Sequence, residues 1–455
     1  MTALIALSAA LRLGWITSTS LWFDEVFSLV IARAGLKETL PLALVVDANS
    51  LLFSLILHFW IRIAGESLLA LRLLPFIFGL AALIIYGRWC WIERKEKALL
   101  PVSMGCFSYF WIYHGTELRA YSLFLLLGIL SHLCFLKILR SEALLSKGWS
   151  LFAVNLMGLY THLYFLFIVV GQCLWLWKKK KPLLAFNVGA LLFFLPWLFF
   201  CLQRRAQYGS EIYPLSLQNF LTTLGTLWVG KNLLEMVGPL WISGAGALFF
   251  IFCLWGGWTA FKNSDELGTY AAGLSLFTVL AAIFSGILVG QSHLTGRYLM
   301  GVSPLLFFLP GIGLSAMPKR TQIFGKFLIG LVLICGAGSQ IALKSAVDPD
   351  FAGKTARIAQ IAPPDALIVH TAPYWYVSLN YYYCPGYAHA LFTPEDKQIF
   401  FMTDPKIPKN ILIKSWDDVQ LQGKRILLVD PMHRFAPKTY TFLRSAKEYQ
   451  NIEKK

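Results

Sequence analysis

Four short polar segments interrupt an otherwise apolar chain, and their side chains are of the types that could carry chemistry. They supply carboxylates, a histidine and two arginines: Asp24 and Glu25, Glu117 and Arg119, His162, and Arg297 followed by Tyr298. A carboxylate can take the proton from an attacking hydroxyl, and arginines can hold a departing phosphate through charge-assisted bonds. If the fold brings the four segments together, the set suits transfer of a group from a phosphate-bearing lipid.

Each segment also has a purely structural explanation. Asp24 could cap a helix through Val26–Ala34, and Glu25 would be favoured by the dipole of that helix. Glu117 and Arg119 could form a local ion pair or an interfacial anchor. A histidine at a helix end is commonly an interfacial residue with its hydrogen bonds satisfied, and an arginine at the start of a span is commonly a snorkelling anchor. The chemical interpretation therefore depends on all four segments meeting at one face.

The composition indicates a membrane protein. Of the 455 residues, 57% are apolar and only 14% are charged, against roughly 25% charged residues in a soluble domain. This excludes a soluble globular enzyme, a disordered chain and a fibrous repeat. The net charge of +16 fits basic loops at an anionic membrane face better than nucleic-acid binding. We expect a lipid bilayer as a partner and no nucleic acid.

Eleven apolar runs are candidates for membrane-spanning helices. They cover residues 1–17, 68–91, 98–114, 119–139, 149–161, 162–177, 183–201, 237–260, 268–289, 298–316 and 324–343. The polar triplet 160–162 predicts a turn that divides the run 149–177 into two helices. A twelfth run, Ser50–Ala64, would form about 23 Å of helix and is too short for the ~30 Å hydrocarbon core. We expect it to lie at, or dip into, the interface.

Charge then predicts the orientation. With 50–64 outside the membrane, alternate loops carry 15 basic and 5 acidic residues on one face, which the positive-inside rule makes cytoplasmic. The other face, the exoplasmic one, receives the loop 18–67, Glu117, His162, Arg297 and the C-terminal region. All four polar segments would therefore share that face.

The composition changes again from about Lys344. Short strand-like runs at 366–370 and 425–430 alternate with helical stretches and polar turns, which is typical of an α/β domain. We predict a transmembrane domain over 1–343, with interfacial helices in its first loop, 18–67, and a soluble exoplasmic α/β domain over 344–455.

The order of the motifs resembles that of a known family. The matching segments are Leu21–Glu25 with Ser28, Asp47 leading to Leu51–Trp60, Ala70–Leu73, Glu117–Tyr121, Tyr160–His162, and Arg297–Leu299 with Pro304. They resemble the GT-C membrane glycosyltransferases, in particular the protein-mannosyltransferase-like and Rgt/ArnT-like bacterial branch. The resemblance covers nearly the whole chain and includes the arrangement of a transmembrane core with an exported C-terminal domain.

The resemblance implies an inverting transfer of a sugar from a polyprenyl-phosphate donor to a glycan, lipid or protein hydroxyl on the exoplasmic side of the plasma membrane. Asp24 would be the base and Glu25 a secondary catalytic candidate. Glu117 would organise the donor phosphate or, with Asp24, a divalent metal such as Mg²⁺ or Mn²⁺. The residues implied on the phosphate side are Arg119, His162, Arg297 and Tyr298.

The acceptor side departs from the family pattern. Asp47 and Asn49 are the acceptor-side candidates, but many relatives have His-Pro-Pro-Leu after the acid, where this chain has Ala48-Asn49-Ser50-Leu51. The main alternative function is a transporter or flippase of a lipid-linked saccharide. Against it, the chain has no pair of matching halves, and its charged groups lie at one face rather than at midplane. A third interpretation is a non-catalytic scaffold.

Overall fold

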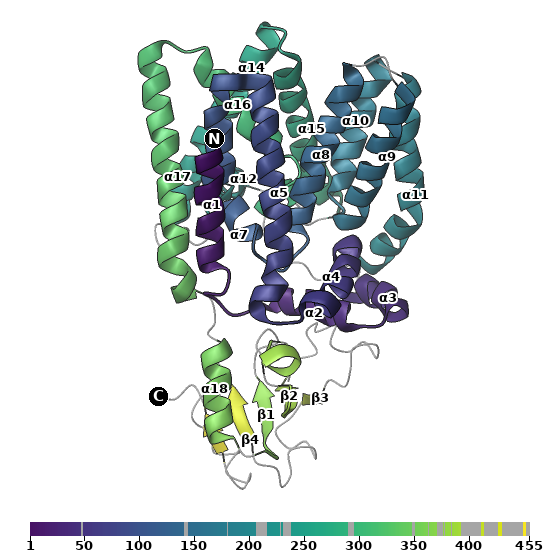
Figure 1. Cartoon of the computed structure of the whole chain (residues 1–455), viewed down its shortest axis with the longest axis vertical. Coiled ribbons are helices and arrows are strands. Elements are labelled where there is room, and N and C mark those ends of the chain that lie inside the picture. The colour runs from purple at the N-terminus through teal and green to yellow at the C-terminus, as the bar shows by residue number, and fades with distance from the viewer. Residues whose placement is uncertain are drawn as a thin grey trace.

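We analysed a computed structural model of the whole chain. It describes residues 1–46, 49–140, 144–179, 181–205, 216–227, 229–230, 238–289, 295–347, 351–362, 364–370, 376, 378–383, 385–392, 411–413, 426–429 and 449–451. The fold is a bundle of long helices with a small parallel sheet beyond one end (Figure 1).

The bundle is built from the apolar runs. Its helices are α1 Thr2–Trp15, α5 Leu68–Arg94, α6 Leu99–Phe107, α7 Tyr109–His114, α8 Tyr121–Leu139, α9 Leu144–Thr161, α10 Phe165–Lys179, α11 Lys181–Arg205, α12 Leu217–Thr226, α14 Pro239–Lys262, α15 Glu266–Val289, α16 Ser303–Ser315 and α17 Lys319–Val347. In the described part of the chain, six helical stretches are long and apolar enough to cross a membrane. The mostly helical, membrane-spanning architecture is confirmed, and the count of eleven spans stays a prediction.

Two of the predicted runs differ from single helices. The run 98–114 is interrupted at Ser108, which has extended backbone angles and caps α7 by accepting a hydrogen bond from the Trp111 N–H. The run 298–316 begins as a short 3₁₀ helix, η2 Gly296–Leu299, and α16 starts only at Ser303. Hydropathy alone could not reveal either break, because apolar residues continue through both. The predicted division of 149–177 is confirmed by α9 and α10.

Three helices of the first loop gather at the end of the bundle that faces the sheet: α2 Phe23–Arg33, α3 Leu36–Val46 and α4 Leu51–Ala64 (Figure 1). The predicted helix at 50–64 is confirmed as α4, whose 14 residues make about 21 Å of helix. It packs against α2, α3 and the start of α5. The loop therefore forms a helical layer over one end of the bundle.

The C-terminal part contains a five-stranded parallel sheet in the order β3-β2-β1-β4-β5. The strands are β1 Leu367–His370, β2 Ala388–Phe392, β3 Ile411–Ile413, β4 Ile426–Val429 and β5 Tyr449–Asn451. The two strand-like runs of the sequence are confirmed by β1 and β4. Helix α18 Phe351–Ile361 and a short π-helix, η3 Leu379–Tyr383, join Ile368 of β1 in a small buried core. Helix α17 continues past the predicted domain boundary at 343/344 to Val347.

At the opposite end of the bundle, ion pairs connect three loops that the charge pattern assigns to one face. Arg94 binds both oxygens of Asp265 at 2.9 and 2.7 Å, and Arg140 binds Glu93 at 2.6 Å and Glu266 at 3.1 Å. These contacts agree with the predicted grouping of the basic loops.

Candidate functional site

The start of α2 is held by an arginine from α5. Arg72 Nε and Nη2 donate to the two carboxylate oxygens of Glu25 at 3.0 and 2.8 Å. The same guanidinium also donates to the backbone oxygens of Ile16, Thr19 and Ser20. Arg72 is 4% exposed and Glu25 is 2% exposed, so the pair is shielded from water. It fixes the turn that leads from α1 into α2.

Glu25 also connects α2 to the segment between α7 and α8. Its Oε1 accepts the Leu118 N–H at 2.9 Å, and its Oε2 accepts the Trp22 N–H at 2.8 Å. Each oxygen therefore receives two hydrogen bonds. Arg72 is a residue that the sequence reasoning missed as a site residue, although it lies in the segment Ala70–Leu73 that carried part of the family resemblance. The signal was an arginine near the start of a span, which requires a partner.

Asp24 points in a different direction from its neighbour. Its side chain is 30% exposed, and Oδ2 lies 3.7 Å from Nη1 of Arg297, whose side chain is 43% exposed. Arg119 Nη1 donates to the backbone oxygen of Asp24 at 3.2 Å and to Ser28 Oγ at 3.3 Å. The structure thus brings together Asp24, Arg119 and Arg297. The alternative that Asp24 caps the helix is wrong, because α2 begins at Phe23 with Trp22 at the N-cap.

Glu117 lies near Arg119 and Arg297, the two arginines that contact Asp24, and is paired with a histidine. His114 Nδ1 is 2.6 Å from Glu117 Oε2, and both side chains are about nine-tenths buried. Burial alone would raise the pKa of the Glu117 carboxyl. The nearby charges of His114, Arg119 and Arg297 outweigh that effect and lower this pKa below its ordinary value of 4.5. His114 was also missed as a site residue, although its spacing of three residues from Glu117 on a helix end was a usable signal.

His162 and Tyr298 form an aromatic wall next to Arg297. The His162 ring stacks on Phe124 at 4.6 Å and lies 5.4 Å from the Tyr298 ring. Its Nδ1 accepts the Tyr164 N–H, so the neutral ring carries its proton on Nε2. The Arg297 guanidinium lies 5.5 Å from the centre of the Tyr298 ring. Of the four predicted phosphate-side residues, Arg119 and Arg297 therefore meet at Asp24, and His162 and Tyr298 lie next to Arg297.

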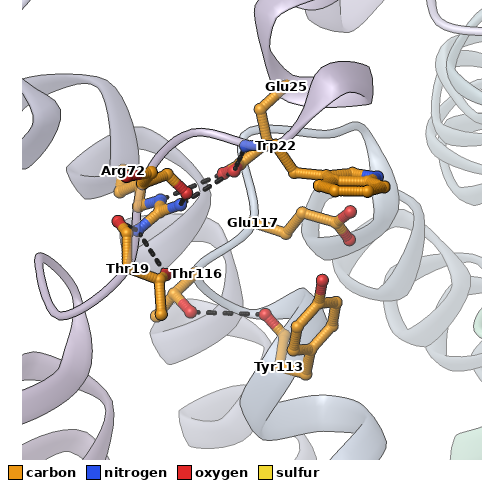
Figure 2. A pocket seen from close by; sticks show the side chains of 8 residues that line it. Thr19, Trp22, Glu25, Arg72, Tyr113, Thr116 and Glu117 are labelled. Atoms are coloured by element: carbon orange, nitrogen blue, oxygen red, sulfur yellow. Dashed lines mark hydrogen bonds and ion pairs between the residues drawn. The ribbon is translucent and has the colours of Figure 1, made fainter. Parts of the chain in front are cut away.

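A small pocket opens between these elements (Figure 2). It is lined by Thr19, Ser20, Trp22, Glu25, Arg72, Tyr113, Thr116 and Glu117. Its volume of about 10 Å³ is room for about one water molecule. Figure 2 shows the Trp22 indole beside the Glu117 carboxylate, with Tyr113 on the other side of that carboxylate. The pocket wall thus combines aromatic rings with acidic and hydroxyl groups.

The predicted acceptor side is only partly described. Asp47 lies outside the described residues. Asn49 lies half-buried in the turn before α4 and is not among the residues that line the pocket. The structure therefore leaves the acceptor-side roles of both residues as predictions.

The described side chains alone do not complete a site for the predicted divalent metal, which stays a prediction. In the part of the chain that the structure describes, no group of three or more His, Cys, Asp or Glu side chains could hold an ion. Mg²⁺ and Ca²⁺ take six or more oxygen ligands, whereas one Glu117 oxygen faces His114 and one Asp24 oxygen faces Arg297.

Comparisons with proteins of known structure identify the fold. No family model and no curated protein sequence matches the chain. Two solved structures of ArnT from Cupriavidus metallidurans, one in the apo state and one bound to undecaprenyl phosphate, superpose with a TM-score of 0.62 at 14% identity. The match covers 97% of this chain and 94% of ArnT. The chain has the GT-C fold.

A second GT-C protein shows a weaker likeness. The oligosaccharyltransferase of Archaeoglobus fulgidus, tethered to an acceptor peptide containing the NVT sequon, gives a TM-score of 0.50 at 10% identity. That match covers 85% of this chain and 63% of the oligosaccharyltransferase. At these identities the likeness establishes the GT-C fold, and the assignment of individual residues rests on the contacts described above.

Proposed function

We propose that the protein is an inverting glycosyltransferase, which moves a sugar from a polyprenyl-phosphate donor to an acceptor hydroxyl. The observation that carries the proposal is the meeting of Asp24 with Arg119 and Arg297 at one end of a GT-C bundle. The structure of ArnT with undecaprenyl phosphate supports the choice of donor, because that protein of the same fold binds a polyprenyl phosphate.

Asp24 is the proposed base. It is the more exposed of the two adjacent carboxylates, and its Oδ2 lies 3.7 Å from Nη1 of Arg297. In the proposed step the acceptor oxygen forms a bond to C1 of the sugar while its proton passes to the Asp24 carboxylate. A single displacement from the face opposite the phosphate inverts the configuration at C1.

Arg119 and Arg297 are the proposed phosphate-binding groups. As the bond between C1 and the phosphate oxygen breaks, its electron pair stays on that oxygen and adds a negative charge to the leaving polyprenyl phosphate. Guanidinium groups stabilise this charge through bidentate contacts. A phosphate that attracts Arg297 also draws it away from Asp24, which leaves the carboxylate more basic when the donor is bound. Nε2–H of His162 and the Tyr298 ring complete the phosphate side.

Glu25 has a different role from Asp24 in this proposal. Because both of its oxygens are occupied by Arg72 and by backbone N–H groups, it has no lone pair directed at a substrate. Glu25 is a positioning residue that holds α2 against the Glu117 segment. Glu117, held by His114, faces the pocket and orients the donor.

The proposed setting is a plasma membrane, with the site and the C-terminal domain on the exoplasmic side. The charge pattern supports this orientation, since the basic loops joined by Arg94 and Arg140 lie at the opposite end of the bundle. The acceptor would be an envelope glycan, a glycolipid or a protein.

The test compares envelope glycolipids, glycans and glycoproteins by mass spectrometry in cells with and without the protein. We expect one sugar to disappear in cells that lack it and to return with the wild-type chain. The purified protein in liposomes should then release polyprenyl phosphate from the corresponding donor in the presence of acceptor. A flippase would move the donor lipid without releasing polyprenyl phosphate, and that result would overturn the proposal.

A further inference from the structure

Three consecutive tyrosines of the C-terminal part contact the helical layer that carries Asp24. The Tyr383 hydroxyl accepts the Leu21 N–H, just before α2. The backbone oxygen of Tyr381 accepts a hydrogen bond from Arg33 at the end of α2. The Tyr382 hydroxyl donates to the backbone oxygen of Glu66 at 3.1 Å. The short helix η3 is thus attached at both ends of α2.

The contact with Leu21 falls in the segment that forms one wall of the pocket. Arg72 holds the backbone oxygens of Thr19 and Ser20, and Glu25 holds the Trp22 N–H. Tyr383 holds the remaining residue, Leu21, whose side chain is fully buried. A buried N–H that loses its partner is costly, so the segment 19–22 depends on the tyrosine to keep this conformation.

Trp22 connects the C-terminal part directly to the pocket. Its indole lines the pocket beside Glu117 (Figure 2). It also packs against the small core formed by Phe351, Ile358, Ile368 and Leu379 in the C-terminal part. One side chain therefore touches both the pocket and the C-terminal core.

The Tyr383 phenol stays neutral over the working range of pH. Burial raises the pKa of Tyr383 to about 12. Its oxygen is therefore available to the Leu21 N–H under all ordinary conditions, and the contact should not depend on pH between 5 and 9.

We propose that Tyr383 is a positioning residue for sugar transfer: by binding the Leu21 N–H it fixes the segment 19–22, so that Trp22 and Asp24 keep their places opposite the Glu117 segment. The inference rests on the proposed function for its catalytic part. The C-terminal domain would then complete the pocket of the transmembrane domain rather than act as an independent module.

The test compares Tyr383→Phe with Tyr387→Phe. Tyr387 packs against the same C-terminal core but has no described hydrogen bond to residues 16–66, so it is a matched control. Hydrogen–deuterium exchange of the full-length protein in nanodiscs measures protection of the peptide that contains Leu21 and Trp22. We expect at least tenfold faster exchange there in Tyr383→Phe and none of this change in Tyr387→Phe.

Kinetics give the second measurement on the same preparations. Loss of positioning should lower kcat about tenfold while KM for the lipid donor stays within about twofold. The melting temperature should fall only slightly, because the loss is confined to the segment 19–22. Unchanged exchange at Leu21 would overturn the inference, and so would faster exchange with unchanged kcat. If the wild-type protein transfers no sugar from any polyprenyl donor, the proposed function fails, and the exchange result still decides whether Tyr383 holds the segment.

Discussion

The two ends of the helix bundle use charge in different ways. At the end with the basic loops, Arg94 and Arg140 bind their carboxylates at ordinary hydrogen-bond distances of 2.6 to 3.2 Å. At the other end, Asp24 and Arg297 are separated by 3.7 Å, and both side chains remain partly exposed. The close pairs tie neighbouring loops together, whereas the partly exposed Asp24 and Arg297 are the groups that we propose to meet the substrate.

The same contrast exists within the site, between two adjacent residues. Glu25 is buried and receives four hydrogen bonds from Arg72 and two backbone N–H groups. Asp24 faces outward toward Arg297. The buried carboxylate supports the fold, and the partly exposed one is the proposed base.

Replacement of the buried arginine should damage the fold. Arg72→Met leaves the Glu25 carboxylate buried without a cation, which costs about 3–5 kcal/mol. We expect a large fall in melting temperature in detergent, measured against the wild type. The double variant Arg72→Met with Glu25→Gln should recover part of the loss, because it removes the buried charge. An Arg72→Met protein as stable as the wild type would show that the pair does not support α2.

Replacement of the exposed arginine should impair donor binding instead. Arg297→Lys keeps the charge but loses the planar fork that grips phosphate, so we expect KM for the polyprenyl donor to rise about tenfold, equal to about 1.4 kcal/mol, with little change in stability. Steady-state kinetics in liposomes measure this. Arg94→Lys at the opposite end is the control and should leave KM unchanged. An equal rise in KM in Arg297→Lys and Arg94→Lys would contradict the proposal that the donor phosphate binds at the Arg297 end of the bundle.

Lowering the pH should destabilise the fold at the end of the bundle that carries the site, because the Glu117 carboxylate becomes protonated. Its folded-state pKa lies below the ordinary 4.5, so its charged form stabilises the fold above about pH 4.5, and this contribution is lost as the pH falls through the folded pKa. Melting temperatures measured from pH 7 down to pH 4 and below should fall less steeply in Glu117→Gln than in the wild type. Identical pH profiles for the two proteins would contradict the assignment.

The smallest effect is expected from replacing Asp265, which pairs with Arg94 at the end of the bundle that carries the basic loops. Asp265 and Arg94 are each about one-fifth exposed, and such a partly solvated pair contributes about 1 kcal/mol or less. Asp265→Asn should lower the melting temperature slightly and leave the transfer rate within about twofold of the wild type. A large loss of transfer would mean that chemistry depends on this end as well.

Much of the fold was predictable because hydrophobic runs of sufficient length specify helices directly. The turn between α9 and α10, the helix α4 and the strands β1 and β4 followed from local pattern. The break at Ser108 did not, because extended backbone angles at a single residue leave the hydropathy of the run 98–114 unchanged.

The sequence predicted most of the residues that meet at the site, but it did not predict the role of each one. Adjacent residues on a helix point about 100° apart, so Asp24 and Glu25 had to differ, but only the packing of α5 decides which one meets Arg72. The contact between Tyr383 and Leu21 joins residues more than 300 positions apart. No local pattern predicts such a pairing, which depends on how the C-terminal part docks on α2.

The most direct test of the account measures sugar transfer by Asp24→Asn and Asp265→Asn side by side in liposomes with the polyprenyl donor. Both substitutions remove one carboxylate charge, one at each end of the bundle. We predict that Asp24→Asn lowers the rate of polyprenyl phosphate release by about a thousandfold, with insertion and melting temperature retained, while Asp265→Asn stays close to the wild type. Full activity in Asp24→Asn would contradict the central claim.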